Sequence, residues 1–215
     1  MIKFKIFMLI IFGLLIFNLG LSDKASAELT VDANHNHIKI DFFYHGDMVN
    51  VKGISDLGAD IIIKITSPEG HQVLRKKGKM AGLLWMNVGE LRFEHAPDIY
   101  FLHSTKRIED ILSNEEMAKY AIGYSALKEH IEITPVKDES DNNKCFNEFV
   151  RFKESSSLYS ASVGKISTEV KNRKQDYYIK LNWPYQAPPG NYTVTIYAVK
   201  EKKVIEKAEA NIKVE

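Results

Sequence analysis

The stretch GKMAGLLWMNVGELRFEHAPDIYFLHS, residues 78–104, is the densest apolar and aromatic run of the chain outside its N-terminus. Gly82, Gly89 and Pro97 interrupt it where a sheet would have to turn. Short apolar runs bounded by such residues are typical of strands that pack in a β-sheet core. The stretch therefore predicts core strands of a β-sandwich, with Trp85 and Tyr100 as structural residues.

Strand-like alternation continues on both sides of this stretch. Residues 38–44 alternate with a period of two, and residues 60–67 carry isoleucines on both faces, as expected of a covered central strand. Residues 177–183 and 192–197 alternate again near the C-terminus. The sequence thus predicts a mainly β protein.

Between these strands the apolar spacing changes to that of helices. Ser113 and Glu116 have the form of a capping box, and an apolar stripe with helical spacing follows from Met117 to Leu127. A charged linker at 137–144 precedes a second predicted helix from Lys144 to Ser156.

A proline followed by a tyrosine at the head of an apolar strand occurs twice, at Tyr100 and Tyr192. This pattern resembles the tyrosine corner of immunoglobulin-like domains, so we predict immunoglobulin-like β-sandwich lobes with a helical segment between them. One elongated sandwich with inserted helices is the alternative. The predicted divisions are a signal peptide at 1–27, an N-terminal lobe at 28–104, a helical segment at 105–160 and a C-terminal lobe at 161–215.

The first residues have the three parts of a secretory signal peptide. Lys3 and Lys5 precede an uncharged apolar run, and Ala25-Ser26-Ala27 forms a small-residue cleavage site. We expect cleavage before Glu28 and export to the periplasm; a retained signal anchor is the alternative. Because Glu28 is not cysteine, no lipoprotein anchor is indicated.

Composition excludes few classes of function. The formal net charge is +1, so no global field favours nucleic acid or an anionic membrane. Cys145 is the one cysteine of the sequence, which excludes an intrachain disulfide and favours a half-buried apolar side chain over a reactive thiol.

The sequence contains no nucleophile elbow, zinc-hydrolase motif, phosphate-binding glycine loop or dinucleotide fingerprint. We therefore predict a protein that is not an enzyme and has no cofactor, with a hydrolase of unknown type as a third-ranked function. The second-ranked function is metal binding. His35 and His37 lie two residues apart and would share one face of a strand, where a third ligand such as Glu28 or Asp32 would complete a copper or zinc site.

Two surface features indicate binding. Arg75, Lys76, Lys77 and Lys79 form a basic run, which we interpret as a docking edge for anionic headgroups or an acidic partner, or as a solvated edge strand. Trp183, Tyr185 and Tyr197 near prolines offer a stacking platform for sugar or peptide. In the alternative interpretation Trp183 belongs to an alternating core strand and Tyr185 fills a loop. We expect Trp183 and Tyr192 to be structural residues.

Several motifs together resemble one protein family. The most specific are Leu84-Trp85-Met86-Asn87 and Trp183-Pro184-Tyr185-Gln186-Ala187-Pro188-Pro189-Gly190 with Tyr192, joined by Phe43-Tyr44-His45-Gly46. The chain is similar along nearly its whole mature length to an uncharacterised proteobacterial family of putative transmembrane proteins.

The resemblance implies an exported domain at the periplasmic face, usually followed by a C-terminal membrane helix and often encoded near sulfite-exporter-type permeases. This chain reaches Glu215 with no apolar run of about 18 residues after the signal. We therefore expect a non-enzymatic exported accessory protein of the cell envelope whose partner is an integral membrane permease. The family supplies no catalytic residue, and the oligomeric state stays open.

Overall fold

The computed structural model describes residues 28–34, 37–41, 44–80 and 84–215. Strands dominate these residues, which confirms the predicted mainly β class. None of the described helices is both long enough and apolar enough to span a bilayer. The predicted signal peptide lies outside the described residues.

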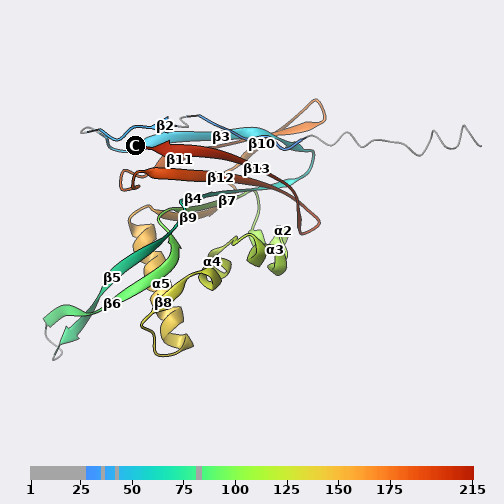
Figure 1. Ribbon diagram of the computed structural model, residues 1–215. Coiled ribbons are helices and arrows are strands. Elements are labelled where there is room, and N and C mark those ends of the chain that lie inside the picture. Colours follow the sequence, from blue (N-terminus) through green and yellow to red (C-terminus); the bar gives the residue numbers. More distant parts are fainter. Residues whose placement is uncertain (1–27, 35–36, 42–43, 81–83) are drawn as a thin grey trace, which may run out of the picture.

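Two sheets face each other as a sandwich, and a third layer covers one of them (Figure 1). The first sheet has the strand order β1-β3-β11-β10 and is antiparallel throughout. Its strands are β1 (Asp32–Ala33), β3 (Asp47–Asp56), β10 (Ser167–Lys171) and β11 (Lys174–Trp183).

The second sheet has the order β2-β13-β12-β4-β7-β9 and lies in the middle of the molecule. Two of its pairs are parallel, β2 with β13 and β7 with β9. Its strands are β2 (His37–Ile38), β4 (Asp60–Thr66), β7 (Tyr100–Ser104), β9 (Tyr159–Val163), β12 (Gly190–Lys200) and β13 (Lys203–Val214).

The third layer combines four helices with a small sheet of order β5-β6-β8. A parallel pair needs a long crossover, and most of this layer is the crossover that connects β7 to β9. The elements of the third layer are β5 (Glu69–Met80), β6 (Leu84–Pro97), α2 (Ile108–Ile111), α3 (Asn114–Lys119), α4 (Tyr124–His130), β8 (Glu132–Thr134) and α5 (Glu139–Ser155).

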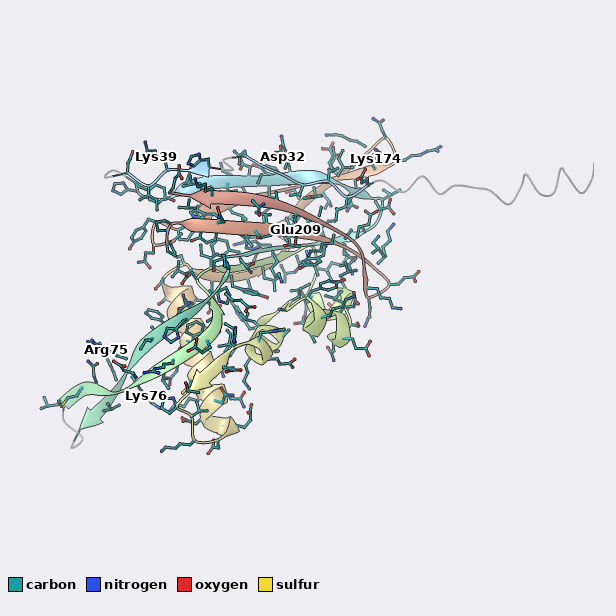
Figure 2. The ribbon with its side chains drawn as sticks, viewed as in Figure 1. Asp32, Lys39, Arg75, Lys76, Lys174 and Glu209 are labelled. Atoms are coloured by element: carbon teal, nitrogen blue, oxygen red, sulfur yellow. The ribbon has the colours of Figure 1, made fainter. Side chains whose placement is uncertain are left out.

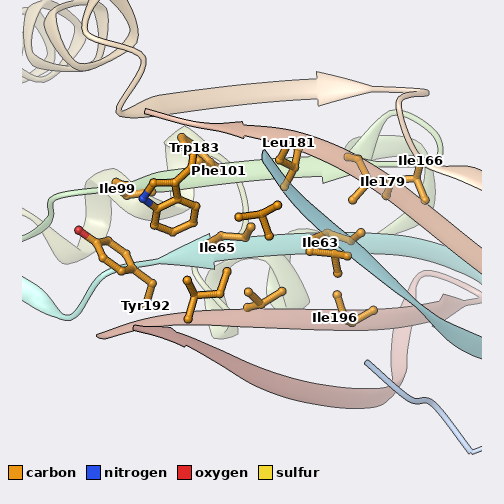
Figure 3. Close-up of a cluster of buried hydrophobic side chains, with 14 of the residues drawn as sticks. Ile63, Ile65, Ile99, Phe101, Ile166, Ile179, Leu181, Trp183, Tyr192 and Ile196 are labelled. Carbon is orange, nitrogen blue, oxygen red and sulfur yellow. The ribbon is translucent and has the colours of Figure 1, made fainter. Parts of the chain in front are cut away.

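A first core fills the space between the two large sheets (Figure 3). Ile61, Ile63 and Ile65 of β4 point into it, as their alternation predicts. Trp183 stands edge-on to Tyr192, with ring centroids 4.9 Å apart. Both side chains are buried, so their predicted structural role is confirmed.

A second core lies on the opposite face of the middle sheet, beneath the helices. Ile62 of β4 faces it, which confirms that this strand is covered on both sides. Phe93 stacks on Phe149 of α5 at 4.3 Å, and Tyr159 meets Phe149 edge-on at 5.7 Å. The middle sheet therefore carries apolar side chains on both faces.

The strands of the two predicted lobes are interleaved, which corrects the proposed division at 28–104 and 161–215. β3 pairs with β11 over ten residue pairs, and β12 pairs with β4 over seven. Alternation defines which face of a strand is buried but not which strand lies beside it. The described residues thus form one sandwich with an inserted helical layer.

The two expected tyrosine corners differ. The Tyr192 hydroxyl donates to the carbonyl of Pro188, four residues upstream, as a tyrosine corner requires. The Tyr100 hydroxyl instead donates to the Ala121 carbonyl and accepts from the Gly123 N–H, both at 2.9 Å. Tyr100 is buried and structural, but it fixes the helical layer to β7 and is not a tyrosine corner.

Local helix signals were partly correct. Ser113 caps α3 by accepting from the Glu116 N–H at 3.3 Å, while the Glu116 carboxylate accepts from the Val204 N–H. α5 begins at Glu139, where Asp138 caps it, so the predicted linker at 137–144 is mostly helix. The first turn of α5 is polar, and its buried residues start only at Cys145. The apolar pattern therefore predicted the start of this helix too late in the sequence.

Candidate functional site: a projecting amphipathic hairpin

β5 and β6 form a long antiparallel hairpin whose far end extends beyond the helical layer (Figure 1). The near end belongs to the second core, because Leu91 and Phe93 of β6 are buried there. We call the face that carries Leu74 and Leu91 the inner face, since it is turned toward α5. The opposite face is the outer face.

Strand register assigns the far-end residues to these faces. Leu74 pairs with Leu91 on the inner face, and the alternation of β5 keeps Gly78 on it. Met86 pairs with Gly78 and therefore lies on the inner face. β6 has one extra residue at Val88, a β-bulge. A Cβ at Gly78 would lie 2.9 Å from Val88 Cγ2, so Val88 covers Gly78.

The inner face at the far end is apolar and uncovered. Leu84, Met86 and Val88 are 67%, 44% and 50% exposed. Isolated exposed apolar residues are ordinary, but three on one face of a projecting hairpin form a continuous apolar surface. The side chain of Trp85 lies outside the described set, so its predicted structural role is not tested.

The basic run lies on the same hairpin. Arg75 and Lys76 are far from the labelled charged residues of the sandwich (Figure 2). Arg75, Lys77 and Lys79 lie on the exposed outer face, whereas Lys76 lies on the inner face. The Lys76 ammonium is 3.9 Å from the Asp141 carboxylate of α5. Three of the four residues of the predicted docking edge therefore share one face, and the fourth bridges to the helix.

A groove of about 550 Å³ lies between the hairpin and α5. Leu74, Leu91 and Phe93 line one wall, and Phe149 and Phe152 line the other. The rim carries Arg75, Lys76, Lys77, Lys144 and Glu148, which leaves it mainly cationic.

Sequence reasoning missed the α5 wall of this groove because a helical pattern alone does not show that Phe149 and Phe152 lie opposite the β5–β6 hairpin. In the structure Phe152 is exposed. Cys145 also lines the groove, but it is buried, and burial raises the pKa of its thiol. This environment fits the expected apolar side chain and disfavours a reactive thiolate.

The predicted metal site is described only in part. His35 lies outside the described residues, and His37 Nε2 is 2.7 Å from the Glu215 carboxylate. Asp32 pairs with Lys52 at 3.3 Å. Within the described ranges, no group of three His, Cys, Asp or Glu side chains is placed to hold a metal ion. The hypothesis therefore stays a prediction.

The aromatic platform is not formed, which corrects that interpretation. Trp183 and Tyr197 are buried in the first and second cores, and only Tyr185 of the three is exposed. A run of aromatic residues in alternating strands cannot show from the sequence alone which of them a second layer covers.

Fold and site define a mainly β, three-layered protein with a projecting amphipathic hairpin. The family model described as "Putative transmembrane protein (Alph_Pro_TM)" matches residues 28–215, and the chain belongs to this family. A comparison with curated proteins found no match.

Proposed function

We propose that this protein is a non-enzymatic, exported interaction module of the cell envelope that docks on a membrane protein through the β5–β6 hairpin. The observation that supports it best is the far end of the hairpin, which is apolar on its inner face and basic on its outer face. The sequence pattern of residues 1–27 supports export, and the family description supports an association with a membrane.

The chemistry of the two faces indicates the kind of partner. Burying the exposed parts of Leu84, Met86 and Val88 would contribute on the order of 3 kcal/mol, which favours an apolar contact surface. Arg75, Lys77 and Lys79 would attract and orient an acidic segment beside it. An integral membrane permease with an acidic exposed loop fits both requirements.

The test is affinity purification of the tagged full-length chain from its native envelope in mild detergent. We compare the wild type with a Leu84→Asp, Met86→Asp variant and with Val170→Asp as the matched control, because Val170 is an exposed apolar residue of β10 on the sandwich. The N-terminus of the recovered chain, read by mass spectrometry, checks cleavage before Glu28.

The proposal expects an integral membrane protein that is recovered with the wild type and the control but not with the hairpin variant. Equal recovery with all three chains would contradict docking by the hairpin. If the wild type binds protein-free anionic vesicles and no protein is recovered from the envelope, the proposal of a protein partner is wrong and the hairpin binds the lipid surface.

A further inference from the structure

A second cavity, separate from the hairpin groove, lies where the helical layer ends over the middle sheet. It measures about 300 Å³ and is bordered by β4, β12 and β13, by α3 and α4, and by the base of the hairpin. Its lining is rich in cationic side chains and contains one carboxylate, that of Glu69. The cationic and histidine residues are Lys64, Lys119, Lys207, His95 and His130.

Lys64 is the central cation of this cavity. It interrupts the isoleucine run of β4 and lies on the same face as Ile62. Its ammonium donates to the carbonyl of Tyr120 and lies 5.8 Å from the ring centre of Tyr197. Burial, and secondarily the charge of Lys207, lowers its pKa to about 8, although Glu209 opposes the shift.

Three of the other four basic residues, two lysines and a histidine, have carboxylate partners at the rim. Lys207 lies 2.7 Å from Glu209, and Lys119 lies 3.6 Å from Glu116. His95 lies 3.3 Å from Glu69. The hydrogen-bond partner of Lys64 is a carbonyl, which leaves its charge less completely balanced than those at the rim.

The backbone brings His95 to this cavity in an unusual conformation. His95 has a φ of 60°, and the pairing of β5 with β6 is irregular next to it. A positive φ is uncommon for residues other than glycine, and bulges often redirect a side chain at the edge of a site. Two tyrosines add an aromatic wall, since the rings of Tyr120 and Tyr197 lie 5.2 Å apart.

We infer that this cavity binds a small organic anion, with its carboxylate or phosphate group on Lys64 and its carbon skeleton against Tyr120 and Tyr197. A charge-assisted hydrogen bond to a partly buried ammonium is stronger than one in water. The volume is at the lower end of small-molecule sites. Glu69 and Glu209 disfavour further negative charges, so the ligand carries its charge at one end.

The probes are inorganic phosphate, butyrate and benzoate, each titrated at low ionic strength and followed by calorimetry and by amide chemical shifts. We expect saturable binding of at least one probe to the wild-type chain, with shifts at β4, α3 and β12. Lys64→Met should weaken that binding about tenfold or more. Lys52→Met, on an exposed lysine of β3, is the matched control and should bind as the wild type does.

Two milder variants keep the test decisive if Lys64→Met fails to fold. Lys207→Gln and His95→Gln change exposed side chains of the rim, and each should weaken binding severalfold. Absence of saturable binding for all three probes, or an unchanged affinity in the folded Lys64 and rim variants, would overturn the inference. The Leu84→Asp, Met86→Asp variant should bind the probes normally, so this test is independent of the hairpin proposal.

Discussion

The two halves of residues 78–104 have a similar content of apolar residues but opposite surroundings. Residues from Leu91 to Ser104 are largely buried between layers, whereas Leu84, Met86 and Val88 are exposed on the projecting hairpin. Apolar density thus predicts strands in both halves but burial in only one. The difference separates side chains that stabilise the fold from side chains that remain available for a partner.

The largest contrast comes from one substitution made in each half. Leu102→Ala removes a side chain that is 2% exposed in the second core and should cost about 3 kcal/mol of unfolding free energy. Leu84→Ala should change stability by about 0.5 kcal/mol or less. Urea unfolding measures both, and similar costs would show that the far end of the hairpin is packed.

Two glycines extend the comparison to the backbone. A Cβ at Gly53 of β3 would lie 2.0 Å from the Thr30 carbonyl oxygen and 2.5 Å from the Tyr177 hydroxyl. Gly53→Ala should therefore cost about 2–3 kcal/mol, because backbone as well as side chain must move.

Gly89, on the hairpin, is the matched control. Among the described residues, no atom beyond Gly89 and its chain neighbours lies within 4 Å of a Cβ placed there, so Gly89→Ala should be neutral or slightly stabilising. Thermal unfolding of the two variants checks both expectations. A loss at Gly89 as large as that at Gly53 would contradict the open far end of the hairpin.

The buried half also predicts a dependence on acid. Burial, and secondarily the charge of Lys165, lowers the pKa of His103 from 6.5 to about 4, and its Nδ1 lies 2.6 Å from Ser162 Oγ. As the pH falls, His103 takes up its proton in the unfolded chain before it does so in the folded chain. The contribution of neutral His103 to the free energy of unfolding is therefore complete above pH 6.5 and is lost as the pH falls through 4.

Between about pH 7 and 4.5 the His103 contribution is about 2–3 kcal/mol. His103→Gln should flatten the pH dependence of stability by that amount, as measured by urea unfolding across this range. His95→Gln, at an exposed position of the same half, serves as the control. Parallel curves for His103→Gln and the wild type would contradict the buried neutral histidine.

The smallest expected effect concerns metal. Because His37 already pairs with Glu215, we expect a His35→Ala, His37→Ala variant to retain the stability of the wild type within about 0.5 kcal/mol. Elemental analysis of both chains, purified without an affinity tag, compares their metal content. Copper or zinc bound by the wild type and lost from the variant would favour the metal-binding function instead.

Local signals predicted local structure well. The isoleucines of β4, the cap at Ser113 and the burial of Trp183 and Tyr192 all follow from the spacing of neighbouring residues. The pairing of β3 with β11 could not be predicted in this way, because pairing between distant strands depends on contacts that no local pattern records.

The candidate sites show the same limit. The basic run on β5 was visible in the sequence, but its alignment beside an apolar inner face depends on the bulge at Val88. The cationic cavity was missed altogether, because its residues come from eight separate helices and strands. The one signal available was Lys64 itself, a lysine within a run of isoleucines predicted to be covered on both faces.

The most direct test of the docking hairpin places a photo-crosslinking amino acid at position 86 in one chain and at position 170 in another. Both positions are exposed and lie on strands, but only the first is on the hairpin. Irradiation of intact envelopes should crosslink position 86, and not position 170, to one integral membrane protein. Equal crosslinking from both positions, or none from position 86, would contradict the account.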